Sequence, residues 1–416
     1  MRRPSVTGAL EALVVAGLVA ALTLGSAAVF GGPSGAPAAT GPAGAPAAGV
    51  AGLQKRLREQ PHDAAGWASL GLAYVDRARV TGDTSYYPKA DGVLRRSLTE
   101  EPGNPGALAG LGALAAARHD FHGALRFADR ALAANPFGQE AAAVRVDALV
   151  ELGRYDDALD AARKADATRP GVPVFTRLAY VRELRGEARE ARRVLQLARD
   201  SATRRDDLAY IAVRLGELAW NDGDLGRAGR EYAEALRLAP GDVPALDGRA
   251  RVRAAQGDSA GALADRAEIV RRLPLPQYLT EYGELLESQG RADEARRQYA
   301  VAGAWARIAA AHGVDAGLET ALFESDHGHP EAALRAARAE YDRRCPGPQV
   351  RQCSVHAADA LAWALHVNGR DREALRHARE AAATGYRGTG FRAHRRAIEK
   401  ALGMRAGART DRGDAS

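Results

Sequence analysis

The sequence predicts an all-α protein, built as a right-handed helical solenoid and preceded by one N-terminal hydrophobic helix. Three observations lead to this prediction. Apolar residues make up 46% of the 416 residues, yet only 6% are aromatic and alanine dominates, which favours helices over strands. A glycine–alanine pair recurs along the chain at a nearly constant interval. Prolines also punctuate the recurring segments at points where a helix should end.

The N-terminal segment, residues 12–30 ("ALVVAGLVAALTLGSAAVF"), contains no charged residue, and Arg2 and Arg3 precede it. It is long enough to cross a bilayer as a helix, and the arginines favour an N-terminus inside and a body outside. We therefore interpret residues 1–30 as a signal anchor. A cleaved signal peptide remains open, because small residues near Ser26 could satisfy a peptidase.

Residues 31–52 form a Gly/Pro/Ala-rich stretch without charges, which is typical of a linker. Such a linker isolates the apolar segment from the rest of the chain, and this disfavours a buried core helix at residues 12–30. The next charged residue after Glu11 is Lys55, so the folded body is expected to begin near residue 53.

The body repeats a Gly-x4-Ala pair in one register. The pairs are Gly153/Ala158, Gly186/Ala191, Gly223/Ala228, Gly257/Ala262, Gly290/Ala295, Gly328/Ala333, Gly369/Ala374 and Gly403/Ala408. Successive glycines lie 33 to 41 residues apart, and a period near 34 indicates a two-helix repeat. We expect the glycine in the turn between the two helices. The alanine is expected where the second helix crosses the first, since a small side chain lets the backbones approach.

The first helix of each unit also has a recurring pattern. Trp67, Leu70, Gly71 and Tyr74 are spaced as W-x2-L-G-x2-Y, and residues 209–219 repeat this spacing. Together with the A-x3-F…P element of the second helices, the pattern resembles the tetratricopeptide repeat (TPR) family. The resemblance implies a solenoid of about nine to ten units over residues 53–405, followed by a disordered tail at 406–416.

The wider arrangement resembles exported or membrane-anchored actinobacterial TPR proteins of unassigned function. The stretches "TGDTSYYPKA", "ESDHGH" and "SVHAADALAWALHVNGR" carry that likeness. Two departures from a regular array are expected. The first unit carries an insertion near "RVTGDTSYYP", and the eighth unit, about 314–347, matches the first-helix pattern poorly.

Few residues suggest chemistry. No G-x-S-x-G, P-loop, H-E-x-x-H or Rossmann glycine pattern occurs, so we expect no catalytic residue, no cofactor and no enzyme activity. The net charge of +6 is spread over helix faces among nearly as many acids, which speaks against a nucleic-acid partner. Seven of the ten histidines follow residue 311, but Asp326–His329 offers too few converging ligands for a tight metal site.

The two cysteines, Cys345 and Cys353, are eight positions apart between the eighth and ninth units. Outside the cytoplasm such a pair should form a disulfide. By loop-closure arithmetic it would contribute roughly 2–3 kcal/mol.

The helix face that should line the concave groove changes character along the array. Its first two units hold small apolar residues, whereas the fourth and fifth hold large aromatics beside charges. The predicted partner-binding residues are Arg177, Tyr180, Tyr210, Arg214, Glu217 and Trp220. Aromatics beside arginine are the residue types that carry binding energy at interfaces. The alternative is that Tyr210 and Trp220 simply pack between neighbouring units.

Two functions follow as hypotheses. The favoured one is a non-catalytic extracytoplasmic scaffold that binds a peptide or protein partner in its groove and is held at the cell membrane by the N-terminal segment, or else is secreted. The alternative is an accessory or catalytic component acting on cell-envelope material, with a His/carboxylate metal site in the C-terminal third.

The topology is testable. If residues 12–30 span the membrane with Arg2 and Arg3 inside, protease added to intact spheroplasts should digest the repeat body. Protection of the body until the membrane is lysed would contradict this orientation.

Overall fold

The computed structural model describes residues 49–345 and 353–404. The predicted signal anchor (1–30), nearly all of the linker (31–52) and the tail (406–416) lie outside the described residues. Within the described ranges, no helix is both long and apolar enough to cross a membrane.

Every regular element of the described chain is a helix, and nine antiparallel helix pairs follow one another. The first helices of units 1 to 9 are α4 (Ala64–Thr81), α6 (Pro105–Ala117), α8 (Gln139–Glu151), α10 (Val172–Leu184), α12 (Arg205–Asp222), α14 (Val243–Ala255), α16 (Pro276–Ser288), α18 (Gly317–Asp326) and α20 (Val355–Val367). The second helices are α5 (Tyr86–Glu100), α7 (Phe121–Ala134), α9 (Tyr155–Thr168), α11 (Ala188–Ser201), α13 (Leu225–Leu238), α15 (Ser259–Arg272), α17 (Ala292–Ala311), α19 (Pro330–Arg344) and α21 (Asp371–Ala382). Two single helices flank the pairs: α3 (Val50–Glu59) and α22 (Thr389–Ala401). The predicted all-α solenoid is therefore confirmed.

The recurring residues have the expected places in each unit. All eight repeat glycines, from Gly153 to Gly403, adopt positive φ between 66° and 90°; seven follow the first helix of a pair, and the last follows α22. The alanines that come after them, from Ala158 to Ala374, are at most 1% exposed where the two helices cross. Several second helices begin at an aspartate, such as Asp224, whose carboxylate accepts a hydrogen bond from a backbone N–H of the first turn.

Neighbouring units pack through small residues set against large ones. The ring of Tyr232 in α13 is fully buried between Gly216 of α12 and Gly248 of α14. A Cβ at Gly216 would lie 2.7 Å from that ring, and one at Gly248 would lie 2.2 Å from it. Glycine at these positions is therefore needed for the tyrosine to fit, and the close approach keeps the alanine-rich layers thin.

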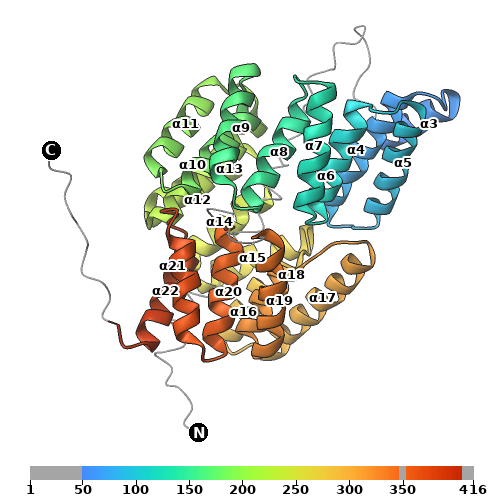
Figure 1. Cartoon of the computed structure of the whole chain (residues 1–416). Helices are drawn as coiled ribbons and strands as arrows, with labels where there is room; N and C mark the ends of the chain where they lie inside the picture. Colours follow the sequence, from blue (N-terminus) through green and yellow to red (C-terminus); the bar gives the residue numbers. More distant parts are fainter. Residues whose placement is uncertain (1–48, 346–352, 405–416) are drawn as a thin grey trace.

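The solenoid turns far enough to pack against itself. Figure 1 shows two tiers, in which α19 to α22 lie beneath α8 to α12. We call α3 to α13 the N-terminal tier and α16 to α22 the C-terminal tier; α14 and α15 connect them. Hydrogen bonds between the tiers join residues 169 to 228 positions apart, or about six repeats of ~34 residues.

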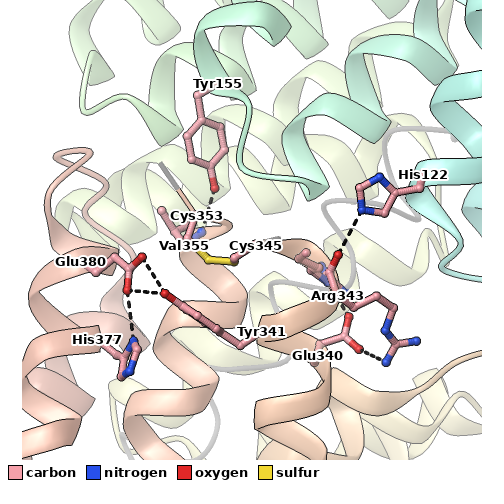
Figure 2. Close-up of a disulfide and its surroundings, with 11 residues drawn as sticks. His122, Tyr155, Glu340, Tyr341, Arg343, Cys345, Cys353, Val355, His377 and Glu380 are labelled. Carbon is pink, nitrogen blue, oxygen red and sulfur yellow. Dashed lines mark hydrogen bonds and ion pairs between the residues drawn. A yellow bond between two sulfur atoms is a disulfide. The ribbon is translucent and has the colours of Figure 1, made fainter. Parts of the chain in front are cut away.

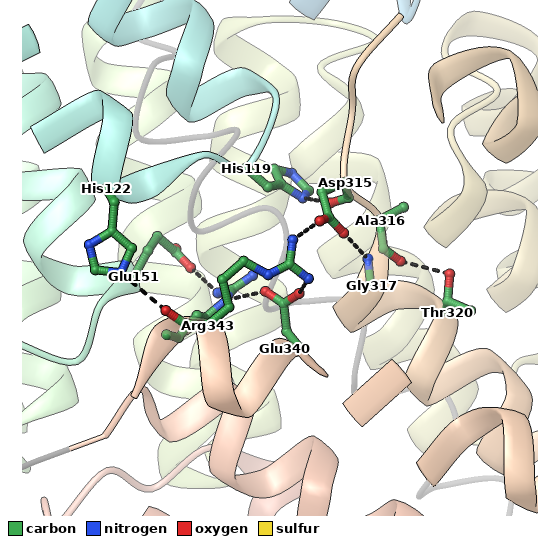
Figure 3. Close-up of polar contacts among 10 residues, drawn as sticks. His119, His122, Glu151, Asp315, Ala316, Gly317, Thr320, Glu340 and Arg343 are labelled. Atoms are coloured by element: carbon green, nitrogen blue, oxygen red, sulfur yellow. Dashed lines mark hydrogen bonds and ion pairs between the residues drawn. The ribbon is translucent and has the colours of Figure 1, made fainter. Parts of the chain in front are cut away.

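The contacts between the tiers come mostly from the turns that end the first helices of the N-terminal tier. In unit 1, Trp305 Nε1 donates to the carbonyl of Gly82 at 3.1 Å. In unit 2, the carbonyl of Asp315 lies 2.6 Å from His119 Nδ1, and that of Arg343 lies 3.1 Å from His122 Nε2 (Figure 3). The same face of each early unit therefore meets a later unit.

Unit 3 makes the most buried of these contacts. Glu151 of α8 receives a hydrogen bond from Arg344 Nη1 at 2.6 Å, and Arg344 also pairs with Glu340. All three side chains are at most 4% exposed. Beside them, a Cβ on Gly153 would lie 2.3 Å from the backbone of Cys353 and Ser354, so only glycine allows the two tiers to meet at this turn.

Cys345 and Cys353 form a disulfide at this junction, with their Cα atoms 5.2 Å apart (Figure 2). The bridge closes the connection between units 8 and 9. Next to it, the backbone N–H of Val355 donates to the hydroxyl of Tyr155 at 2.8 Å. The disulfide thus fixes Cys353 close to Val355, whose backbone N–H contacts the N-terminal tier.

Two features differ from the expected boundaries. The predicted linker extends to residue 52, but helix α3 begins at Val50 and buries Leu57 against unit 1. The insertion in unit 1 is not a loose loop. Its first residues complete the 18-residue helix α4, and Gly82, which follows that helix, accepts the hydrogen bond from Trp305 of α17. Its last residues begin α5.

Candidate functional site

The six predicted groove residues lie on α10 and α12, the first helices of units 4 and 5. Five of them are buried, with exposed fractions of 6–8%: Arg177, Tyr180, Arg214, Glu217 and Trp220. Tyr210 is half-buried. The sequence carried no indication that most of these side chains are buried within the chain.

Contacts within the chain account for this burial. Arg177 Nε donates to Asp147 at 3.0 Å, and Arg214 lies between Glu217 and Glu183. The Arg214 guanidinium also sits 4.9 Å from the centre of the Tyr180 ring. The predicted aromatic–arginine neighbours are therefore real neighbours, and they are paired with carboxylates from their own or adjacent helices.

The C-terminal tier covers this region. Tyr180 Oη lies 3.2 Å from His356 Nε2 of α20, and the backbone of Trp220 and Asn221 contacts α22 through Thr389 and Arg392. Burial lowers the pKa of His356 to about 4, so its ring is neutral at pH 7. Burial also raises the pKa of Asp147 to about 6 despite Arg177. Partner binding by the six residues stays a prediction, and their burial favours the packing alternative.

The inner face remains open where units 1 and 2 face units 7 and 8. A cavity of about 400 Å³ lies there, within the size range of ligand-binding pockets. We call it the inter-tier cavity. Its walls come from the ends of α4 and α6 in one tier, and from α16, α17 and α18 in the other.

Much of the wall is apolar. Small side chains such as Ala113 and Ala302 line it beside Trp305 and Phe323. His119 also contributes to the lining, and it holds the turn position that glycine holds in units 3 to 9. Its φ of 63° is the one positive value among described residues other than glycine. A side chain in this conformation costs about 1 kcal/mol or more, so the inter-tier hydrogen bond of His119 must help to hold it.

The polar part of the wall is acidic. Five carboxylate side chains line the cavity, against one guanidinium, that of Arg79. The acidic residues are Glu281, Glu284, Glu319, Glu324 and Asp326. Arg79 is already paired with Asp76, with Nη2 and Oδ1 2.6 Å apart. The cavity therefore combines an apolar wall with a surplus of acidic over basic side chains.

Burial raises the pKa of Glu284 and of Asp326. Glu284 Oε1 lies 3.4 Å from His327 Nε2, and Asp326 accepts a hydrogen bond from Trp363 Nε1 at 2.8 Å. For His327, burial favours the neutral ring, but the hydrogen bond and charge of Glu284 outweigh it and raise the pKa. These acids and histidines therefore pair within the chain at the rim of the cavity.

Other histidines of the C-terminal third also pair with a carboxylate. His329 lies 2.6 Å from Glu324, and His394 of α22 lies 2.8 Å from Asp359 of α20. Across residues 49–345 and 353–404, no group of three or more His, Cys, Asp or Glu side chains is arranged to hold a metal ion. His327, His329 and His394 thus each have a single carboxylate as partner.

The packing alternative for the groove residues makes a clear prediction. Replacing Tyr210 and Trp220 together with alanine should lower the free energy of unfolding by about 3–5 kcal/mol, the cost of truncating a large buried aromatic. Denaturant unfolding followed by circular dichroism measures this. Phe137→Ala is the control, because Phe137 is 73% exposed and its loss should change stability little. Unchanged stability in the double variant would contradict the packing alternative and favour a binding role for both residues.

Comparison with known proteins supports the repeat assignment. The chain is 37% identical over 89 residues to human tetratricopeptide repeat protein 36 and 37% identical over 89 residues to the mouse protein. Each match covers 20% of this chain, and the chain spans about half the length of the curated relatives it matches: 47% of the human protein and 48% of the mouse protein. No protein-family model matches the chain.

Solved structures with a similar helical array include a thermophilic TPR protein of Thermus thermophilus. It is 26% identical with a TM-score of 0.40, over 49% of this chain and 98% of that one. Yeast Tom70 is 15% identical with a TM-score of 0.41, over 85% of this chain and 84% of its own. At TM-scores below 0.5, such likenesses say nothing further about this chain. The nine helix pairs of the described residues and the glycine–alanine register fit a tetratricopeptide-type repeat array, and the chain is similar to the mammalian tetratricopeptide repeat proteins over 89 residues.

Proposed function

We propose that this chain is a non-catalytic scaffold that holds a segment of a partner protein in the inter-tier cavity. The observation that carries the proposal is the cavity itself. It lies on the inner face of a TPR-type solenoid, the surface on which repeat folds bind extended partners. The cavity is open, whereas the rest of that face is filled by ion pairs within the chain.

The make-up of the wall supports a peptide as the occupant. Binding sites are mostly apolar with a few polar groups that fix orientation, and this wall has both parts. The two tiers that form it are held together by the contacts of Gly82, His119 and Glu151. A site built from two tiers that already contact one another is preorganised, which lowers the conformational cost of binding.

We further propose that the scaffold works outside the cytoplasm and is tethered by residues 12–30, or is secreted if that segment is cleaved. The apolar sequence after Arg2 and Arg3 supports this location. The paired cysteines, Cys345 and Cys353, also support it, because disulfides persist in oxidising compartments. The resemblance to exported actinobacterial proteins stays a prediction.

A cavity-filling variant tests the proposal. Gly303 of α17 lines the cavity, and a Cβ added there would meet only Arg307, at 3.7 Å. Gly303→Leu should therefore occupy the cavity without disturbing its walls. We expect partner capture, measured by crosslinking in intact cells and quantitative mass spectrometry, to fall at least about tenfold, the loss that ~1.4 kcal/mol of binding energy represents.

The matched control is Gly92→Leu. Gly92 is exposed on α5, and an added Cβ there has no neighbour within 4 Å. Both variants replace a helical glycine, so both should keep or slightly raise the melting temperature. Equal capture by the wild type and both variants would rule out the inter-tier cavity as the binding site.

A further inference from the structure

The inter-tier cavity holds buried carboxylate oxygens that the described chain leaves without a hydrogen-bond donor. They are Oε1 of Glu281, Oε2 of Glu284 and Oε2 of Glu319. The side chain of Glu281 is 3% exposed and that of Glu284 is 11% exposed. A buried acceptor without a donor is unfavourable, and more so if it is charged, so these oxygens favour a ligand that brings donors.

The neighbouring cationic side chains do not supply a donor to every one of these oxygens. Arg266 pairs with Glu281 through Oε2 and is shared with Asp247. His327 reaches Glu284 through Oε1 at 3.4 Å. Each pairing thus leaves the other oxygen of its carboxylate unsatisfied.

The carboxylates also lie on separate elements. Glu281 and Glu284 are one turn apart on α16, and Glu319 belongs to α18. A positive group with several N–H donors can bond to carboxylates that approach from two helices at once. Charge-assisted hydrogen bonds of this kind are about twice as strong as neutral ones.

We propose that the cavity binds a lysine or arginine side chain carried on an apolar stretch of the partner. The carboxylates of Glu284 and Glu319 act as its counter-ions, and Glu281 accepts a further hydrogen bond through Oε1. Trp305, Phe323 and the small alanines contact the flanking apolar residues. This inference rests on the proposed function, since it names the chemistry of the segment that the cavity holds.

Pools of short peptides test it. The probes are fluorescent acetyl-X-X-Lys-X-X-amide peptides, where X is Ala, Leu, Val or Phe, the same pool with arginine, and a pool with norleucine, which has a similar length but no charge. Binding to the full-length protein in detergent is measured by fluorescence polarisation. We expect the lysine or arginine pool to bind at least about tenfold more tightly than the norleucine pool, with the preference weakening as salt increases.

Variants locate the effect. Glu284→Gln and Glu319→Gln should each reduce the preference for the charged pool severalfold, while the exposed Glu331→Gln, which removes the same charge from the start of α19, should not. Circular dichroism checks that each variant is folded. Gly303→Leu should weaken the binding of every pool.

Two results would overturn the inference. If charged and norleucine pools bind equally and Gly303→Leu weakens both, the cavity binds peptides but does not select a cation, and the proposed function stands alone. If no pool binds while Gly303→Leu still lowers capture in cells, the cavity accepts a different chemistry.

Discussion

The contact between the two tiers determines most of what is distinctive in this molecule. A helical repeat array is held locally, since each helix pair buries its apolar face against its neighbours. Here the array turns until units 1 to 5 meet units 7 to 9 and α22, about six repeats later. The buried Glu151–Arg344–Glu340 group and the close approach at Gly153 hold that meeting point. Contacts far apart in sequence therefore stabilise a fold that otherwise depends on neighbours.

The same contact determines where a partner has room to bind. On α10 and α12, the C-terminal tier approaches closely enough that His356, Thr389 and Arg392 cover the inner face. Between units 1–2 and units 7–8 a cavity remains, and α4 and α17 both contribute to its lining. Charges on the inner face thus have two uses. In the covered part they pair with one another, and in the cavity several carboxylate oxygens are left for a ligand.

Local features of the fold could be predicted from the sequence because they repeat. Glycine in the turn and alanine at the helix crossing follow from backbone conformation and close packing, and Gly257 and Ala262 illustrate both. The spacing of Cys345 and Cys353 likewise indicated a pair that the structure places at disulfide distance. These are relations between residues within one unit or between adjacent units.

The contact between the tiers could not be predicted in this way, because it depends on the small rotation between successive units. That rotation accumulates over about six repeats and leaves no pattern within any one of them. Burial of Trp220 and opening of the cavity beside Trp305 both follow from that rotation. One signal was present: unit 2 has His119 where other units have glycine, and that exception marks a contact with Asp315.

The most direct test of the account compares two turn glycines that differ only in the tier contact. Gly153 has φ 70° and lies against Cys353 and Ser354, whereas Gly257 has φ 85° and an added Cβ would have no neighbour within 4 Å. Alanine at either position should cost about 1–2 kcal/mol for the left-handed backbone. Gly153→Ala should cost a further ~1–3 kcal/mol in the free energy of unfolding, because the added methyl group overlaps the other tier. Equal losses for the two variants would show that the tiers do not meet as described.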